Sequence, residues 1–186
     1  RYLAGITEVA LKKYVSDKTN WREMLKGTAS DENLEDWRHR LAAWHLGSAD
    51  YIADTLRLQQ LFAQGQLLDF GGGIGSHALA AAALPQVERV WFVDLNPHNR
   101  AFVEARATEL GLAAKLGCYR DLADPALPRY FDTIVCLDVL EHLPDPSAQL
   151  EIFADRLGPA GTALLNWYFP NTRPKAFSTQ VDGRDV

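Results

Sequence analysis

A cluster of glycines directly after a short apolar run constrains the fold more than any other feature of this sequence. Residues 67–70 read Leu-Leu-Asp-Phe, and residues 71–75 carry four glycines before a helix-forming segment begins at Ser76. Glycine has no Cβ and tolerates positive φ, so backbone N–H groups in such a bend can approach a ligand near the positive end of the following helix. The pattern predicts a strand, a ligand-binding turn and a helix, in that order.

The segment after Gly65 alternates short apolar runs with longer amphipathic ones, which is typical of strand and helix units on a parallel sheet. Strands are expected at residues 67–70, 90–93, 115–118, 133–137 and 162–167. Helices are expected at residues 76–84, 97–110 and 146–157, the last two opened by Asn96-Pro97 and Asp145-Pro146, with residues 122–130 as a loop. The predicted fold class is therefore α/β: a Rossmann-like three-layer sandwich with a mostly parallel sheet.

The segment before Gly65 is rich in helix formers and shows no strand-like alternation. Asp31 and Glu32 mark an expected helix start, and Gly47-Ser48 separates it from a second helix over residues 49–62. We expect two domains: residues 1–65 as an α-helical N-terminal cover, and residues 66–186 as the Rossmann-like domain.

Composition excludes several classes of function. Lys and Arg number 19 against 24 Asp and Glu, a net charge of −5 with no basic stripe, so a nucleic acid partner is not expected. The longest apolar run, residues 78–84, is far shorter than the roughly 20 residues that cross a bilayer. Cys118 and Cys136 lack the paired spacing of a zinc site, so we expect no metal and a reducing, cytoplasmic location.

Asp94 stands at the end of the second expected strand, 94 − 69 = 25 residues after Asp69. The two oxygens of a carboxylate match the two vicinal hydroxyls of a ribose, so Asp94 is a candidate nucleoside contact. This acid serves NAD(P)-dependent oxidoreductases as well as other nucleoside-binding enzymes. The dinucleotide fingerprint, however, requires Gly or Ala where this chain has Ser76.

Two segments carry a resemblance to a known family. The pattern Asp-x-Gly-x-Gly-x-Gly from Asp69 to Gly75 resembles the first motif of class I S-adenosylmethionine-dependent methyltransferases. Residues 131–146, FDTIVCLDVLEHLPDP, resemble the fourth-strand segment of the small-molecule members, and residues 157–161 resemble the turn before strand five, with Ala160 replacing its central Gly. The resemblance covers residues 67–167 and is greatest to the ubiquinone-biosynthesis-like branch.

This resemblance implies that S-adenosylmethionine is the cofactor and that a methyl group passes to a small-molecule acceptor by in-line displacement. The implied cofactor-binding residues are Asp69, Gly71, Gly72, Gly73, Gly75, Asp94, Leu95, Asp121, Leu122, Leu137 and Asp138. The family sheet has seven strands, whereas this chain ends about twenty residues after its fifth expected strand. Two alternatives stay open: the fold is truncated, or its C-terminal strands come from missing sequence or from a partner domain or subunit.

Removal of a proton from the acceptor calls for a base, and His142 is the candidate because histidine titrates near neutral pH. The same position also suits a residue that only holds the loop. Tyr168 and Trp44 are the expected substrate contacts, although an aromatic residue at helical spacing, such as Trp44, also fits a core position. Two other functions remain open: an NAD(P)-dependent oxidoreductase, and a non-catalytic cofactor-binding domain of a larger protein.

Overall fold

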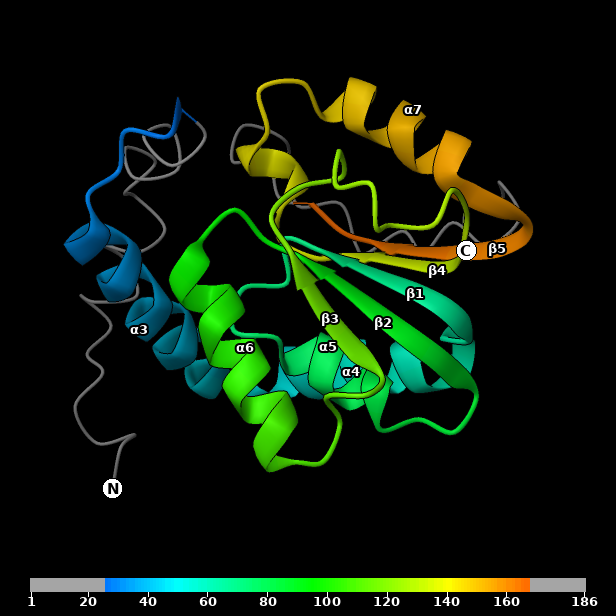
Figure 1. The fold of residues 1–186 in the computed structure, drawn as a ribbon, viewed down its shortest axis with the longest axis horizontal. Helices are drawn as coiled ribbons and strands as arrows, with labels where there is room; N and C mark the ends of the chain where they lie inside the picture. Colours follow the sequence, from blue (N-terminus) through cyan, green and yellow to red (C-terminus); the bar gives the residue numbers. More distant parts are fainter. Residues whose placement is uncertain (1–25, 168–186) are drawn as a thin grey trace.

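The computed structural model describes residues 26–167 of the 186-residue chain. Its helices and strands are α3 (Asp31–Gly47), α4 (Ala49–Phe62), β1 (Gly65–Phe70), α5 (Ser76–Ala82), β2 (Val87–Val93), α6 (Pro97–Glu109), β3 (Leu116–Tyr119), β4 (Phe131–Cys136), η2 (Leu140–His142), α7 (Pro146–Arg156) and β5 (Leu157–Leu165) (Figure 1). All five expected strands and all expected helices are present, with their ends shifted by a few residues.

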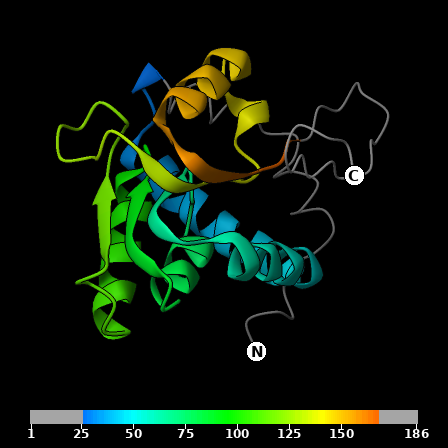
Figure 2. The same ribbon diagram turned by 90° about the vertical axis from the view of Figure 1, so that its right-hand side faces the viewer.

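The five strands form one parallel sheet in the order β3-β2-β1-β4-β5. Helices α4, α5 and α6 cover one face of the sheet and α7 covers the other, so the molecule has three layers (Figure 2). This confirms the predicted Rossmann-like sandwich. Because β1 is followed in space by β2 on one side and β4 on the other, the strand order reverses beside β1, and ligands of open α/β sheets bind at such a point.

Both faces of the sheet are buried, which explains the continuous apolar runs of its strands. Leu67 and Leu68 are neighbours in β1, and because side chains alternate along a strand they point to opposite faces. Leu67 packs in the cluster under α5 and α6 with Phe92 and Val103, whereas Leu68 packs in the cluster that contains Phe153 of α7. Each face therefore has its own core.

The helix starts follow their capping residues. Asn96 caps α6 by accepting a hydrogen bond from the His98 amide at 2.9 Å, and Asp145 caps α7 by accepting one from the Ala148 amide at 3.0 Å. Asn96 is fully buried, and its side-chain amide also donates to the Leu34 carbonyl in α3 at 2.8 Å. One capping residue thus fixes the start of α6 and attaches the preceding helix to it.

The N-terminal helices pack directly on the helical layer of the sheet, α3 against α6 and α4 against α5. Residues 1–25, which belong to the expected cover, lie outside the described residues. The division into domains at residue 65 therefore stays a prediction. No helix within residues 26–167 combines the length and apolar character needed to cross a membrane.

The expected turn at residues 157–161 is instead a bulge inside β5. The register moves from Phe131 opposite Leu157 to Thr133 opposite Thr162, so β5 has several extra residues where β4 has one. Pro159 cannot donate a ladder hydrogen bond, and a bulge is where a strand accommodates such a residue. The preceding helix α7 ends at Arg156, where Leu157 takes an extended conformation and begins β5.

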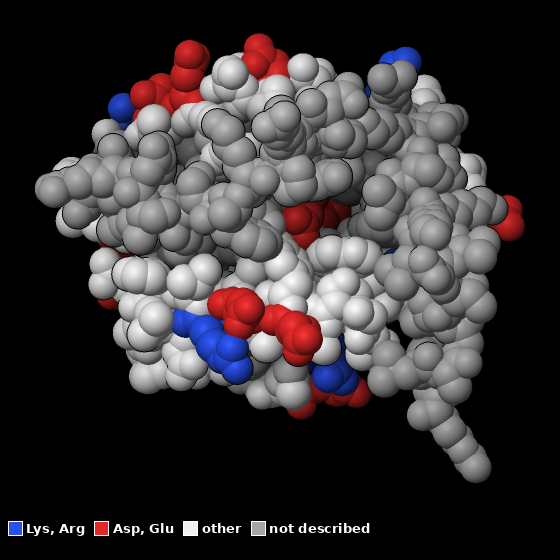
Figure 3. All heavy atoms as spheres, turned by 180° about the vertical axis from the view of Figure 1, so that it is seen from behind, with Lys and Arg blue, Asp and Glu red and all other residues white. Residues whose placement is uncertain are grey.

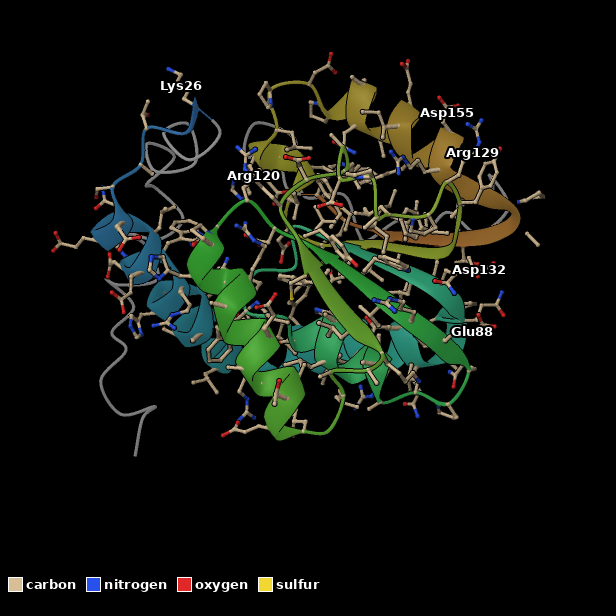
Figure 4. All side chains as sticks on the ribbon, in the orientation of Figure 1. Lys26, Glu88, Arg120, Arg129, Asp132 and Asp155 are labelled. Atoms are coloured by element: carbon tan, nitrogen blue, oxygen red, sulfur yellow. The ribbon has the colours of Figure 1, made fainter. Side chains whose placement is uncertain are left out.

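The edge of the sheet where the strands begin is closed by side chains of the sheet itself. The Asp132 carboxylate accepts the Gln66 amide at 2.7 Å, and Glu88 accepts a hydrogen bond from the Gln66 side chain at 3.2 Å. Both acids lie at the same end of the strands (Figure 4). Ligands of open α/β sheets bind at the opposite edge, where the parallel strands end.

Two glycines with similar φ values test how tightly the start of helix α5 packs against its neighbours. Gly75 precedes α5 at φ +74°, and a Cβ there would lie 2.5 Å from a Val103 methyl, whereas Gly111 at φ +70° has nothing within 4 Å. We expect Gly111→Ala to lower the free energy of unfolding by about 1–2 kcal/mol through backbone strain alone. Gly75→Ala should cost about 1–3 kcal/mol more because the core must also shift. Urea unfolding measures both, and equal losses would contradict the packing described here.

Candidate functional site

A pocket lies where the loops after β1 and β4 meet, at the carboxyl ends of these strands. The loops touch: a Cβ on Gly71 would lie 2.6 Å from a Val139 methyl. The space between the loops is about 590 Å³ when the open solvent at its mouth is included. Its lining residues are Trp37, Leu41, Trp44, His45, Tyr51, Ile52, Asp69, Gly71, Gly72, Gly73, His77, Asp94, Asn99, Leu137 and Asp138.

The glycine loop needs glycine for two separate reasons. Gly71 and Gly73 have φ values of +71° and +58°, which residues with a Cβ rarely adopt. Gly72 has no positive φ, but a Cβ there would lie 2.5 Å from the Asp69 carboxylate and 2.7 Å from the Phe92 ring. The loop therefore presents bare backbone to the pocket, as the sequence predicted.

Asp94 holds the glycine loop to the end of β2. One carboxylate oxygen accepts the Gly73 amide at 2.9 Å, and the other accepts the Asn96 amide at 2.8 Å and the Asn99 side chain at 3.2 Å. Burial raises the pKa of Asp94 to about 6, and these hydrogen bonds oppose that rise. A carboxylate has about four lone-pair positions and three are occupied here, so one remains for a ligand hydroxyl.

Asp69 is a buried acid with one unsatisfied oxygen, although its carboxyl group accepts a hydrogen bond from the Ala78 backbone. Its side chain is 2% exposed, and its Oδ2 atom has no hydrogen bond within the described residues. Burial, together with the charge of Asp94, raises the pKa of Asp69 to about 7. A buried polar atom without a partner is costly, so its position beside the pocket indicates that a ligand or a water satisfies it.

The side chains that line the pocket give it a negative charge. They include Asp69, Asp94 and Asp138, and among the described lining residues there is no Lys or Arg. The two lining histidines, His45 and His77, are neutral at pH 7, because burial lowers the pKa of each to about 4. From behind, the surface shows acidic atoms inside a recess (Figure 3). Such a pocket favours a cationic ligand over an anionic one.

The cover helices form one wall of the pocket and are attached to the start of α5. His45 of α3 forms a 2.8 Å hydrogen bond with the Ser76 hydroxyl, and Thr55 of α4 forms one of the same length with His77. Trp44 packs edge-on against Tyr51, with ring centroids 5.6 Å apart. The wall is therefore aromatic and is held in place by hydrogen bonds.

Eight of the predicted site residues line this pocket. They are Trp44, Asp69, Gly71, Gly72, Gly73, Asp94, Leu137 and Asp138. Gly75 forms the base of the loop as the residue before α5. Tyr168, the other predicted substrate contact, lies outside the described residues.

Four predicted residues are not among those that line the pocket. Asp121 accepts the Ala123 amide at 3.0 Å, and the Leu122 carbonyl accepts a hydrogen bond from Arg156 at 2.9 Å. The Leu95 carbonyl accepts one from Arg100 at 3.0 Å, and His142 ends η2, where its amide donates to the Val139 carbonyl. Their proposed roles as binding or catalytic residues stay predictions.

The structure also adds residues that the sequence did not single out. Asn99 bonds Asp94 from the first turn of α6, and Asn166 follows β5 and bonds Asp138. No motif or spacing in the sequence pointed to Asn99 or to Asn166. Within residues 26–167 no group of three or more His, Cys, Asp or Glu side chains is placed to hold a metal ion.

Comparison with known proteins identifies relatives of this chain. The family model described as "Methyltransferase domain" matches residues 30–176. A "Ubiquinone biosynthesis O-methyltransferase" from Xanthomonas euvesicatoria pv. vesicatoria is 31% identical over 140 residues, which are 73% of this chain and 54% of that protein. The chain thus spans about half the length of the curated relatives it matches.

Solved structures share the fold. The crystal structure of the [4+2]-cyclase SpnF matches 61% of this chain and 43% of its own, with a TM-score of 0.52 and 22% identity. A putative sarcosine dimethylglycine methyltransferase from Galdieria sulphuraria matches the same shares, with a TM-score of 0.50 and 24% identity. At these identities the likeness extends to the fold alone, and one fold here carries two differently named activities.

The raised pKa of Asp69 predicts a pH dependence of stability that Asp69→Asn removes. The unfolded carboxyl ionises near pH 3.8 and the folded one near 7, so between these values the folded state holds one more proton. Stability contributed by this group is then lost as pH rises, by at most about 1.4 kcal/mol per pH unit. Asp69→Asn should gain stability relative to the wild type between pH 5 and 7, measured by urea unfolding.

His45 and His77 act in the opposite sense, since their lowered pKa values cost stability as pH falls below about 6.5. Both histidines are present in the wild type and in Asp69→Asn, so their contributions cancel in the difference between the two free energies of unfolding. Parallel pH curves for the wild type and Asp69→Asn would show that Asp69 is not buried as described.

Proposed function

The chain belongs to the class I S-adenosylmethionine-dependent methyltransferases, and on that premise we propose that its pocket binds S-adenosylmethionine and that it transfers the methyl group to a small molecule. The observation that carries this proposal is the charge of the pocket: a glycine loop and three buried or partly buried carboxylates face it, with no Lys or Arg among the described lining residues. S-adenosylmethionine bears a cationic sulfonium, which such a pocket attracts.

The residues present fit this cofactor. The bare backbone of the glycine loop would hold the methionine end, and Asp94 would accept the ribose hydroxyls. Leu95 would pack on the adenine, Asp121 or the Leu122 amide would contact its edge, and Asp69 has an unsatisfied oxygen beside the loop. The bound cofactor supplies an electrophilic methyl group, and the chain positions the acceptor in line with it and excludes water.

The oxidoreductase alternative fits the pocket less well. A nicotinamide dinucleotide carries a pyrophosphate, and a pocket lined by three carboxylates, with no Lys or Arg among its described lining residues, would repel it. The same fold also occurs in a protein named as a cyclase, so the fold alone does not establish methyl transfer. Turnover therefore has to be measured separately from binding.

Partners and location are also proposals. We propose a small-molecule acceptor, and a reducing cytoplasm is supported by Cys118 and Cys136, which are both free thiols. Strand β5 lies at the edge of the sheet among the described residues. A partner domain or subunit that completes the sheet would pair with it there.

Calorimetric titration tests the cofactor. We expect S-adenosylhomocysteine, the demethylated product, to bind at one site per chain and NADH not to bind. Binding of NADH alone would favour the oxidoreductase, and binding of neither would favour a non-catalytic role for the chain. Incubation with S-adenosylmethionine and a panel of small acceptors, followed by mass spectrometry, then tests methyl transfer.

Replacement of Asp94 tests the placement of the ribose. Asp94→Ala removes the acceptor for the Gly73 amide and for the ribose hydroxyls, so S-adenosylhomocysteine should bind roughly 5- to 150-fold more weakly, about 1–3 kcal/mol. Asp155→Ala, at an exposed position on α7, is the matched control and should bind like the wild type. An unchanged affinity in Asp94→Ala would mean that the ribose lies elsewhere.

A further inference from the structure

Three polar side chains from distant parts of the chain meet at one end of the pocket. Tyr51 comes from α4, Asp138 follows β4 and Asn166 follows β5. The Asn166 side-chain amide donates to the Tyr51 hydroxyl oxygen at 2.5 Å and to the Asp138 carboxylate at 2.9 Å, and its carbonyl oxygen accepts the Asp138 amide. Tyr51 also hydrogen-bonds Asp138. Every pair in this Tyr51–Asp138–Asn166 cluster is thus joined by a hydrogen bond.

The backbone of Asp138 is strained. Its φ of +56° makes it the one non-glycine residue with a positive φ within the described part of the chain. Such a conformation costs about 1–3 kcal/mol and persists where neighbouring contacts impose it. Here the bonds from Asn166 to both the amide and the carboxylate of Asp138 impose it. This conformation holds the carboxyl group at the pocket wall, where Tyr51 and Leu137 also lie.

The surroundings of Asp138 make its carboxylate a stronger proton acceptor than a carboxylate in water. Burial raises the pKa of its carboxyl, and the hydrogen bonds from Tyr51 and Asn166 oppose the rise. The other titratable groups that interact with this cluster are Glu141 in η2, through Tyr51, and Cys136 at the end of β4, through Asp138. A carboxylate has about four lone-pair positions, and its partners here leave room for an acceptor hydroxyl.

We propose that Asp138 is the catalytic base for an aromatic hydroxyl acceptor, with Tyr51 and Asn166 as the residues that position it. The proposal rests on the proposed function, because it concerns the acceptor side of the same pocket. The Trp44 ring beside Tyr51 offers a surface for an aromatic acceptor, whose hydroxyl would then reach Tyr51 and Asp138. His142, the base predicted from the sequence, is not among the lining residues.

The proposed methyl transfer breaks two bonds and forms two. The acceptor O–H bond breaks and its proton passes to the Asp138 carboxylate, while an oxygen lone pair forms the new bond to the methyl carbon. The carbon–sulfur bond breaks with its electron pair retained by sulfur, so the sulfonium becomes a neutral thioether. Asp138 becomes a neutral acid and returns its proton to solvent after the product leaves.

Two phenols of different acidity separate a base from a structural residue. Catechol is protonated at neutral pH, whereas 4-nitrocatechol ionises near neutral pH and needs little help from a base. We expect Asp138→Asn to lower kcat for catechol roughly 10²- to 10⁴-fold and to lower kcat for 4-nitrocatechol far less. S-adenosylhomocysteine binding is measured separately by calorimetry so that kcat is compared at saturating cofactor, and Asp155→Asn should match the wild type in every measurement.

The pH dependence of kcat tests the positioning roles of Tyr51 and Asn166. Tyr51→Phe and Asn166→Ala each remove a hydrogen bond that lowers the pKa of Asp138, so that pKa rises. Because the base must be ionised, the acidic limb of the kcat profile for catechol should move to higher pH. Tyr130→Phe, at a half-exposed position before β4, is the control for the loss of a tyrosine hydroxyl.

Several outcomes would overturn the proposal. An equal fall in kcat for catechol and 4-nitrocatechol in Asp138→Asn would make Asp138 structural. If the acidic limb of the kcat–pH profile for catechol disappeared in His142→Gln but not in Asp138→Asn, the base would be His142. A wild-type protein that binds S-adenosylhomocysteine but methylates neither phenol would reject the acceptor class alone. A protein that binds no S-adenosylhomocysteine would reject the proposed function itself.

Discussion

The hydrogen bond from the Gly73 amide to the buried Asp94 carboxylate connects the parts of the structure on which the site depends. It joins the loop after β1 to the end of β2, and Asn96 and Asn99 at the start of α6 bond the same carboxylate. Asn96 in turn holds α3, which carries part of the pocket wall. The shape of the glycine loop, the position of α6 and the placement of the cover therefore share one buried acid.

Burying acids together is costly, and here the buried acids line a pocket that can hold a ligand. The charge of Asp94 raises the cost of ionising Asp69, and the strained Asp138 adds a third carboxyl group. The histidines nearby do not offset this charge, since burial keeps them neutral. A bound cation would stabilise the ionised acids, and the sulfonium of S-adenosylmethionine is such a cation.

Much of this could be predicted from the sequence because it depends on local rules. The glycine bend, the strand-ending Asp94 and the caps at Asn96 and Asp145 are each set by the conformational needs of a few adjacent residues. The Tyr51–Asp138–Asn166 cluster was not predicted, because 115 residues separate Tyr51 from Asn166 and only the strand order brings them together. The β5 bulge was missed because a Gly-Pro segment fits a turn equally well.

A crystal structure with S-adenosylhomocysteine tests the central claim most directly. We expect the ribose hydroxyls to donate hydrogen bonds to the Asp94 carboxylate and the homocysteine to follow the bare backbone of the glycine loop. The thioether sulfur should lie beside Leu137 and Asp138. A ligand found outside the pocket, or a pocket that Trp37 and Leu41 keep filled in the presence of saturating ligand, would contradict it.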